Sequence, residues 1–291
     1  MALWTRGQSF GERIEIATGL LSTGIAKLVA SDEWTKYLET QATFFSFSFK
    51  NTMLILQQCP QASDVRNYDD WKKAGRHVRE GETGIRIWFP RFKRKAEREV
   101  PEDEGRPIGW GLGPVFDISQ TDGPELPPRQ HDVVQLLPGE GGAELIPHLI
   151  ELAKLEGFSV KFVDLGPVLN GRCNYTRNLI QINKARPLCS QLRTLVHELA
   201  HALLHRGLPP AEWDRGDKEL EAESVAFVVM NVIGIDAGAY SFGYVAGWAG
   251  DKASERVTAS AVLIQRTAKL IVQFLQNAVN HLEEAQEEVA A

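Results

Sequence analysis

The sequence has few cysteines, no long apolar run and no sign of an export signal. Its three cysteines, Cys59, Cys173 and Cys189, lie far apart with no CxxC pair, which argues against a disulfide framework and against a cysteine zinc knuckle. No segment approaches the roughly 20 apolar residues that span a bilayer, and no basic stretch leads into an apolar run near the N-terminus. These absences predict a cytoplasmic protein with reduced thiols and no membrane partner.

A strong positive charge is also missing from the chain as a whole. The net charge is −6, which discourages nucleic-acid binding if it is spread evenly, because phosphate binding needs local positive potential. The excess acidity lies in residues 131–291, with 14 basic and 20 acidic side chains. Residues 66–98 instead carry 11 basic and 5 acidic side chains, a local charge of +6. A nucleic-acid partner is therefore compatible with the N-terminal half.

The length and composition indicate two ordinary globular domains. The chain has 291 residues, of which 43% are hydrophobic and 24% charged, enough for two cores. Residues 122–131, DGPELPPRQH, contain three prolines and a glycine, and neither helix nor central strand persists in such a segment. We expect a linker there, with domains over 1–121 and 132–291.

Hydrophobic periodicity predicts mixed structure in both halves, so the expected fold class is α+β. In the N-terminal half it predicts helices over 11–43, 44–58 and 68–74, strands over 84–90 and 110–121, and a charged loop over 93–107. In the C-terminal half it predicts helices over 142–158, 189–207, 219–234 and 254–288, and strands over 160–165 and 178–183. The strand at 84–90 has a cationic and aromatic outer face.

The motif HELAH at residues 197–201 predicts a divalent-metal site. On a helix His197 and His201 lie about 400° apart, hence on one face, so both imidazoles can bind one cation. Glu198 is one residue round the helix and can reach a bound water without ligating the metal. A catalytic zinc site takes three protein ligands and leaves one position for water, so a third ligand is required.

The best source of the third ligand is the segment KELEAESVAF, where Glu219 and Glu223 lie one helical turn apart. Buried carboxylates are costly unless a metal or a protonated histidine lies nearby. We assign Glu219 as the ligand, because a glutamate four residues ahead of a second carboxylate is the gluzincin pattern, and Glu223 as the partner of a ligand histidine. The two roles could be exchanged, and Glu221 is a weaker third option. His205, four residues after His201, could support the site.

The chemistry expected of such a centre is peptide hydrolysis. Glu198 would take a proton from the water and pass it to the leaving amine while the metal polarises the carbonyl. The strand over 178–183 could bind the substrate by edge pairing. Candidate donors to the oxyanion are Tyr175, Tyr240 and Tyr244.

Basic and aromatic side chains alternate in the N-terminal half, as in proteins that bind single-stranded nucleic acid. Cations attract the backbone, and flat rings stack on bases at about 1–3 kcal/mol each. The candidate DNA-binding residues are Lys50, Asn51, Trp71, Lys72, Arg76, Arg79, Arg86 and Trp88. The alternative is a solvated basic face over a core that contains the aromatic rings.

The block NTMLI, followed by YDDWKKAGRHVREGETGIRIWFP, resembles the N-terminal single-stranded-DNA-binding domain of ArdC-type antirestriction proteins. HELAH with KELEAESVAF resembles the zincin-like domain of the same family. The resemblance covers most of residues 10–250. The matching positions are Asn51, Trp71, Arg76, Arg79, Gly81 and Gly84 in the first block, and His197, Glu198, His201, Glu219 and Glu223 in the second.

The resemblance implies binding of single-stranded DNA, protection of incoming plasmid or phage DNA from host restriction, and a gluzincin-like metallopeptidase domain with one divalent metal, zinc or manganese. Whether this domain hydrolyses peptides is left open, because metal binding and fold can persist without turnover. One alternative is a regulatory metallopeptidase that cleaves a repressor, a restriction component or another protein partner. Another is a binding protein with a structural metal, although structural zinc sites are normally closed by four protein ligands.

Overall fold

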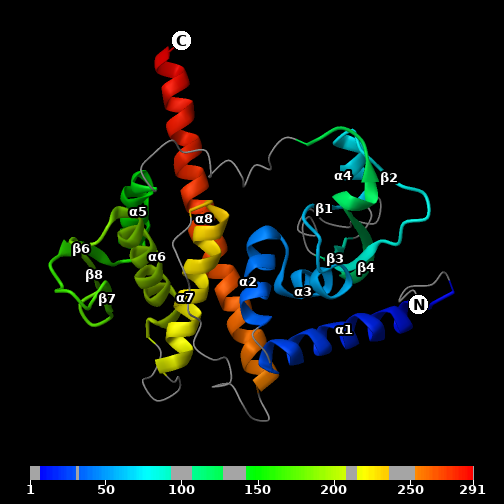
Figure 1. Ribbon diagram of the computed structural model, residues 1–291, viewed down its shortest axis with the longest axis horizontal. Coiled ribbons are helices and arrows are strands. Elements are labelled where there is room, and N and C mark those ends of the chain that lie inside the picture. Colours follow the sequence, from blue (N-terminus) through cyan, green and yellow to red (C-terminus); the bar gives the residue numbers. More distant parts are fainter. Residues whose placement is uncertain are drawn as a thin grey trace. The chain divides into compact units, whose positions relative to one another are not determined.

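The computed structural model describes residues 7–30, 33–92, 107–126, 142–207, 215–235 and 253–290. The chain forms two compact units (Figure 1). The first comprises Met1–Lys27 and Phe47–Leu126, and the second comprises Leu28–Ser46 and Pro127–Ala291. The chain therefore passes between the units three times. Residues 127–131, half of the predicted linker at 122–131, lie outside the described residues, as does most of the charged loop at 93–107.

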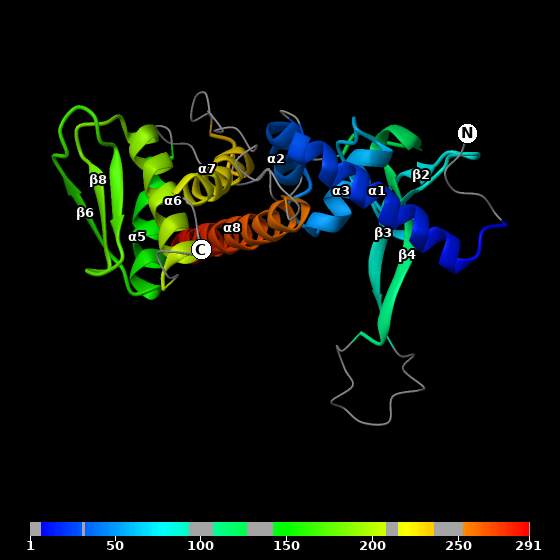
Figure 2. The ribbon, with the colours of Figure 1, turned by 90° about the horizontal axis from the view of Figure 1, so that it is seen from below.

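The first unit consists of helices on a small antiparallel sheet, β1-β4-β3. Its main helices are α1 (Phe10–Ala30), which continues past the unit boundary, α3 (Phe49–Gln58) and α4 (Tyr68–Lys73). Its strands are β1 (Val65–Arg66), β2 (His77–Val78), β3 (Ile85–Arg91), β4 (Gly109–Asp117) and β5 (Thr121–Asp122), with a short 3-10 turn, η3 (Ile118–Gln120), before β5. The long hairpin of β3 and β4 dominates this unit (Figure 2).

Local sequence explains where the helices of this unit begin and end. The Ser48 side chain caps α3, which starts five residues later than the predicted 44–58 helix, and Pro60 follows its end. Asn67 caps α4, whose first turn carries acids and whose last turn carries lysines, as the helix dipole favours. The helix predicted over 11–43 is instead two helices, α1 and α2 (Glu33–Thr43), and the strand predicted over 110–121 ends at Asp117, where η3 follows. The helix predicted over 68–74 and the strand predicted over 84–90 are confirmed. The strands β1, β2 and β5 have two residues each and are too short for any periodicity.

The second unit packs helices against one face of a three-stranded mixed sheet. Its helices are α2 (Glu33–Thr43), α5 (Ile146–Leu155), α6 (Leu188–His205), α7 (Arg215–Val232) and α8 (Ala253–Ala290), with a 3-10 turn, η5 (Ala143–Leu145), ahead of α5. The strands β6 (Ser159–Val163), β8 (Leu179–Asn183) and β7 (Gly171–Asn174) lie in that order. Figure 2 shows α5 and α6 along this sheet.

The core of the second unit places α7 between α6 and α8. Fully buried apolar side chains come from all three helices, among them Leu195, Val225 and Ile264. The Trp34 ring of α2 is also buried, and its Nε1–H donates to Ser224 Oγ of α7 at 3.0 Å. In the parts of the chain that the structure describes, no helix is long and apolar enough to cross a membrane.

The sheet of the second unit corrects the predicted substrate strand. The strand over 178–183 corresponds to β8, which pairs with β6 on one side and with β7 on the other. Its backbone groups are therefore already used, and edge pairing with a substrate at β8 is wrong. The short strand β7, which the sequence analysis missed, lies at the edge of the sheet instead.

Candidate functional site

Three side chains from α6 and α7 converge on one point. His197 Nε2 and His201 Nε2 are 3.1 Å apart, and Glu219 Oε2 is 3.5 Å from each of them. In a tetrahedral site with bonds of about 2.1 Å, ligand atoms lie about 3.4 Å apart, which matches this triangle. His197, His201 and Glu219 can therefore hold a divalent metal ion.

Glu223 orients His197. Its Oε2 lies 2.9 Å from His197 Nδ1, and its other oxygen accepts from Arg193. Since a carboxylate only accepts, the ring donates from Nδ1 to Glu223, and in the neutral ring the lone pair of Nε2 is then directed into the triangle, where a metal would bind. Glu219 thus lies at the triangle and Glu223 behind His197, an arrangement that favours one of the two assignments that the sequence left exchangeable.

A buried chain of hydrogen bonds, through His205 and Glu221, orients His201. His201 Nδ1 lies 3.0 Å from His205 Nδ1, and His205 Nε2 lies 3.0 Å from Glu221 Oε2. Ser260 Oγ of α8 donates to the other oxygen of Glu221. His205 and Glu221 side chains are each only 1% exposed.

The same reasoning assigns the protons in this chain. The Glu221 carboxylate accepts from Nε2–H of His205, so Nδ1 of a neutral His205 accepts from Nδ1–H of His201. The lone pair of His201 Nε2 is then free for a metal. Glu221 is therefore a partner of His205, and its prediction as an alternative ligand is corrected. Ser260 was missed, since a lone serine on a distant helix gives no sequence signal.

Glu198 is 7% exposed and lines a cleft that also contains His197, His201 and Glu219. Burial raises its pKa to about 7, with opposing effects from His197 and Glu219. A carboxyl with such a pKa can accept and return a proton near neutral pH. The pKa of the neighbouring His197 rises to about 9. Burial lowers this pKa, but the hydrogen bonds to Glu219 and Glu223 raise it by more.

The cleft in front of these residues has an accessible volume of about 710 Å³. Its walls come from α6, α7 and the segment around β7, including the half-exposed Tyr175. A Cβ on Gly171 would lie 2.5 Å from Thr194 Cγ2 of α6, so only glycine lets β7 approach α6 this closely. The other two oxyanion candidates, Tyr240 and Tyr244, lie outside the described residues.

Two of the predicted DNA-binding residues of the first unit are solvent-exposed lysines, Lys50 on α3 and Lys72 on α4. Asn51 is different, because it is 9% exposed. Its side-chain amide donates to Trp88 O at 2.8 Å and accepts from Trp88 N at 2.9 Å. Gln58 bonds the backbone of Arg86 in the same way. Asn51 therefore seals the free edge of β3, and its prediction as a DNA contact is corrected.

Trp71 is a core residue. Its side chain is 0% exposed, and its Nε1–H donates to Phe116 O of β4 at 2.9 Å. The guanidinium of Arg66 lies 4.9 Å from the ring centroid. Because the ring is covered on both faces, it cannot stack on a base in this structure, and Trp71 as a DNA-stacking residue is corrected to a structural role.

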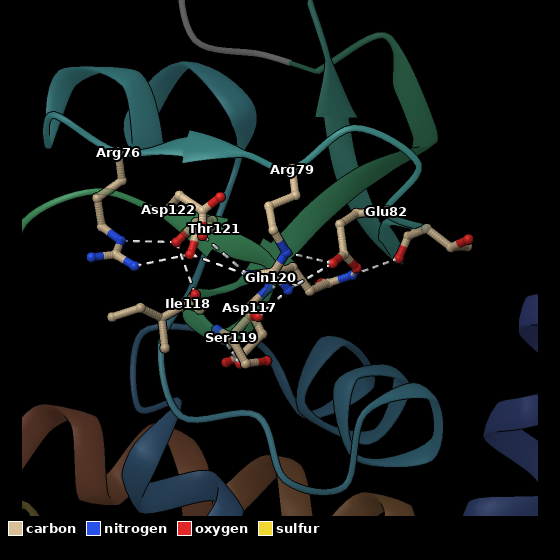
Figure 3. Close-up of polar contacts among 10 residues, drawn as sticks. Arg76, Arg79, Glu82, Asp117, Ile118, Ser119, Gln120, Thr121 and Asp122 are labelled. Carbon is tan, nitrogen blue, oxygen red and sulfur yellow. Dashed lines mark hydrogen bonds and ion pairs between the residues drawn. The ribbon is translucent and has the colours of Figure 1, made fainter.

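Arg76 and Arg79 clamp the chain where β4 leads into β5 (Figure 3). Arg76 donates to the hydroxyl and the backbone carbonyl of Thr121, and also to the backbone carbonyls of Gly123 and Pro124. Arg79 donates to Glu82 and to Ser119 O. Both guanidinium groups are thus engaged within the unit, while the Arg79 side chain is 42% exposed, and contact of these two arginines with phosphate stays a prediction.

Arg86 and Trp88 alone of the predicted residues combine partial exposure with unused donors. Both are half-buried on the outer face of β3. Within the described residues, Arg86 Nε and Trp88 Nε1 are buried without a hydrogen-bond partner. The sequence analysis overlooked Trp110 of β4, which is 59% exposed.

Comparison with known families defines the class of protein that this arrangement represents. Residues 23–112 match the N-terminal domain of anti-restriction factor ArdC. Residues 153–239, which include HELAH and Glu219, match the peptidase family M78 domain described as IrrE N-terminal-like. The molecule is therefore a two-domain α+β protein whose metal centre lies in a peptidase-like domain. The two matches in this order show that the chain is an ArdC-type protein, as the sequence resemblance implied.

One curated protein and one solved structure align with most of this chain. An uncharacterized protein of Bacillus anthracis is 24% identical over 323 aligned positions, which cover 97% of this chain and 54% of the relative. The chain thus spans about half the length of this curated relative. The Mn(II)-bound crystal structure of the antirestriction ArdC protein from plasmid R388 has a TM-score of 0.55 at 18% identity, covering 89% of this chain and 97% of that chain. At this identity the likeness concerns the fold.

Proposed function

We propose that this protein binds single-stranded DNA through its first unit and protects incoming plasmid or phage DNA from restriction with the help of a metal-dependent peptidase centre in its second. The observation that carries the proposal is the metal triangle with two oriented histidines and the buried Glu198 beside it. The ArdC-type domain order supports the DNA part.

We propose zinc as the metal, held by His197, His201 and Glu219. The three ligand separations are 3.1, 3.5 and 3.5 Å, and their mean lies close to the tetrahedral value of about 3.4 Å. An octahedral site with bonds of about 2.1 Å would place neighbouring ligands about 3.0 Å apart. Manganese remains the alternative, because the related plasmid R388 protein binds Mn(II).

The residues of the chain divide the hydrolytic work. A bound zinc ion would supply Lewis acidity towards a scissile carbonyl and lower the pKa of a water. The Oε atoms of Glu198 accept the proton of the attacking water and return it to the leaving amine, for which a pKa near 7 is suited. Glu223 and His205 hold the two imidazoles in place, and Glu198 lines an open cleft with a volume of about 710 Å³.

The proposal is tested by transfer of a plasmid into a restricting recipient. We expect Glu198→Gln to lose protection while keeping the metal. We also expect the double variant Lys50→Gln/Lys72→Gln to lose protection, because it removes two exposed charges from the first unit. The control Lys36→Gln/Lys161→Gln removes two exposed charges from the second unit and should protect normally.

The outcomes separate the two parts of the proposal. Full protection by Glu198→Gln would exclude hydrolysis from the function, and full protection by the Lys50/Lys72 variant would remove these lysines from it. The second candidate function, a regulatory peptidase, is favoured by the open cleft beside Glu198. It predicts a repressor fragment that forms only when Glu198 is intact.

A further inference from the structure

The outer face of β3 holds two hydrogen-bond donors that the fold leaves unused. Arg86 and Trp88 are two residues apart on this strand, so their side chains lie on the same side of the sheet. Arg86 Nε and Trp88 Nε1 are both buried, and neither has a hydrogen-bond partner among the described residues. Since a buried donor without an acceptor is costly, this face is suited to an acceptor that a ligand brings.

The electrostatics of this face indicate that the acceptor is an anion. Burial and the neighbouring charge of Arg13, from α1, lower the pKa of the Arg86 guanidinium. Two other arginines of the unit behave in the opposite way, because hydrogen bonds to Asp64 and Glu82 raise the pKa values of Arg66 and Arg79. Like charges held close together repel unless an anion joins them.

An exposed aromatic ring lies on the same face. Trp110 of β4 pairs directly with Pro90 of β3, which follows Trp88 by two residues. Alternation therefore puts Trp88, Pro90 and Trp110 on one side of the hairpin. With 59% of its surface exposed, Trp110 has a free face for stacking.

We propose that this face binds the backbone of single-stranded DNA. Arg86 neutralises one phosphate beside the positive charge of Arg13, the indole N–H of Trp88 donates to that phosphate, and the ring of Trp110 stacks on an adjoining base. The inference rests on the proposed function and assigns it a site. It also explains a preference for single strands, because a stacking ring requires a base that is not already paired and stacked in a duplex.

The test measures binding of a fluorescent single-stranded oligonucleotide to the full chain by anisotropy over a range of salt concentrations. Arg86→Gln should weaken binding and reduce the slope of log affinity against log salt by about 0.7, as for the loss of one phosphate contact. Trp88→Phe keeps an aromatic ring and removes the indole N–H, so it should lower the affinity and leave the slope unchanged. Trp110→Ala should lower the affinity roughly tenfold and leave the slope unchanged.

The matched control is Lys73→Gln. Lys73 is 77% exposed and paired with Asp70, and its replacement removes one positive charge from the same unit. We expect wild-type affinity and slope for this variant. If Arg86→Gln does not fold, Arg86→Lys takes its place, because it keeps the charge and removes the Nε donor.

The failures of the inference and of the proposed function are distinct. If the wild type binds the oligonucleotide and Arg86→Gln, Trp88→Phe and Trp110→Ala bind equally well, the site is wrong and the proposed function stands. An unchanged affinity for Trp110→Ala alone would overturn the stacking platform. A wild type that binds no oligonucleotide at low salt overturns the proposed function and this site with it.

Discussion

At the scale of single residues, the metal triangle depends on residues that bond its histidines and do not themselves belong to it. His201 can offer its Nε2 lone pair because His205 takes the proton on the other ring nitrogen, and His205 is fixed in turn by Glu221 and Ser260. Such partners set the tautomer and raise the basicity of a metal-binding imidazole. The site therefore reaches from α6 through α7 to α8.

Replacing Glu221 with glutamine should weaken metal binding about 10- to 100-fold while keeping the fold, because the side chain keeps its size and loses its charge. The affinity is measured by competition with a chelating dye. Glu151→Gln, at an exposed position on α5, serves as the control and should bind metal normally. Equal affinities for the two variants would show that the buried chain does not support His201.

The proximity of His197, His201 and Glu219 could be predicted from the sequence because it depends on local geometry. The spacing of His197 and His201 alone sets a shared helix face, and Glu219 and Glu223 lie one turn apart on a second, mostly buried helix. The aromatic residues are harder, because a tryptophan in the core and a tryptophan at a binding surface look alike in a sequence. Trp71 lies in the core and Trp110 is exposed, and only tertiary packing separates them.

At the scale of secondary-structure elements, α3 protects the sheet of the first unit. Asn51 and Gln58 lie seven residues apart on this helix, and their side-chain amides bond the N–H and C=O groups of Trp88 and Arg86. These groups point away from β4 and would otherwise be open to another strand. The helix thus replaces a neighbouring strand with two amide side chains.

Asn51→Ala should make β3 open more easily, because it leaves a backbone N–H and C=O of Trp88 without partners. At about 1–3 kcal/mol for a lost buried partner, hydrogen exchange in β3 should rise roughly 5- to 150-fold. The measurement is exchange by mass spectrometry on peptides covering 85–91. Gln61→Ala, at an exposed position just after α3, should exchange like the wild type, and no change for Asn51→Ala would rule out the sealing role.

Helices and strands whose apolar side chains recur at a regular spacing could be predicted from the sequence. A strand defined only by its pairing with another strand could not. The helices α5, α6 and α8 and the strands β3 and β8 follow from their apolar spacing. The strand β7, with the sequence GRCN, lacks alternation and forms because it pairs with β8 and fits closely against α6 through Gly171. For the same reason, the sequence could not show that β8 is central in its sheet.

At the scale of the whole molecule, the division into two units does not follow the order of the chain. Residues 28–46, including α2, belong to the second unit although they lie between two parts of the first. A fragment ending near residue 126 would therefore carry α2 without its partners on α7. Experiments on the complete chain avoid this difficulty.

Removal of the metal should act on one unit only. Since an ion that binds the folded state stabilises it by about 2.7 kcal/mol at 100 times its dissociation constant, a chelator should lower the melting temperature of the second unit and leave the first unchanged. Scanning calorimetry with and without chelator measures this effect, and His201→Ala should show no chelator effect. Equal shifts of both transitions would contradict independent stability of the units.

The contact between Ser260 and Glu221 has a thermodynamic consequence for the C-terminal helix. If the packing of α8 strengthens metal binding by some factor, metal binding must strengthen the packing of α8 by the same factor. A molecule that holds α8 in place would then act as an activator of metal uptake, and one that displaces it would act as an inhibitor, without entering the cleft.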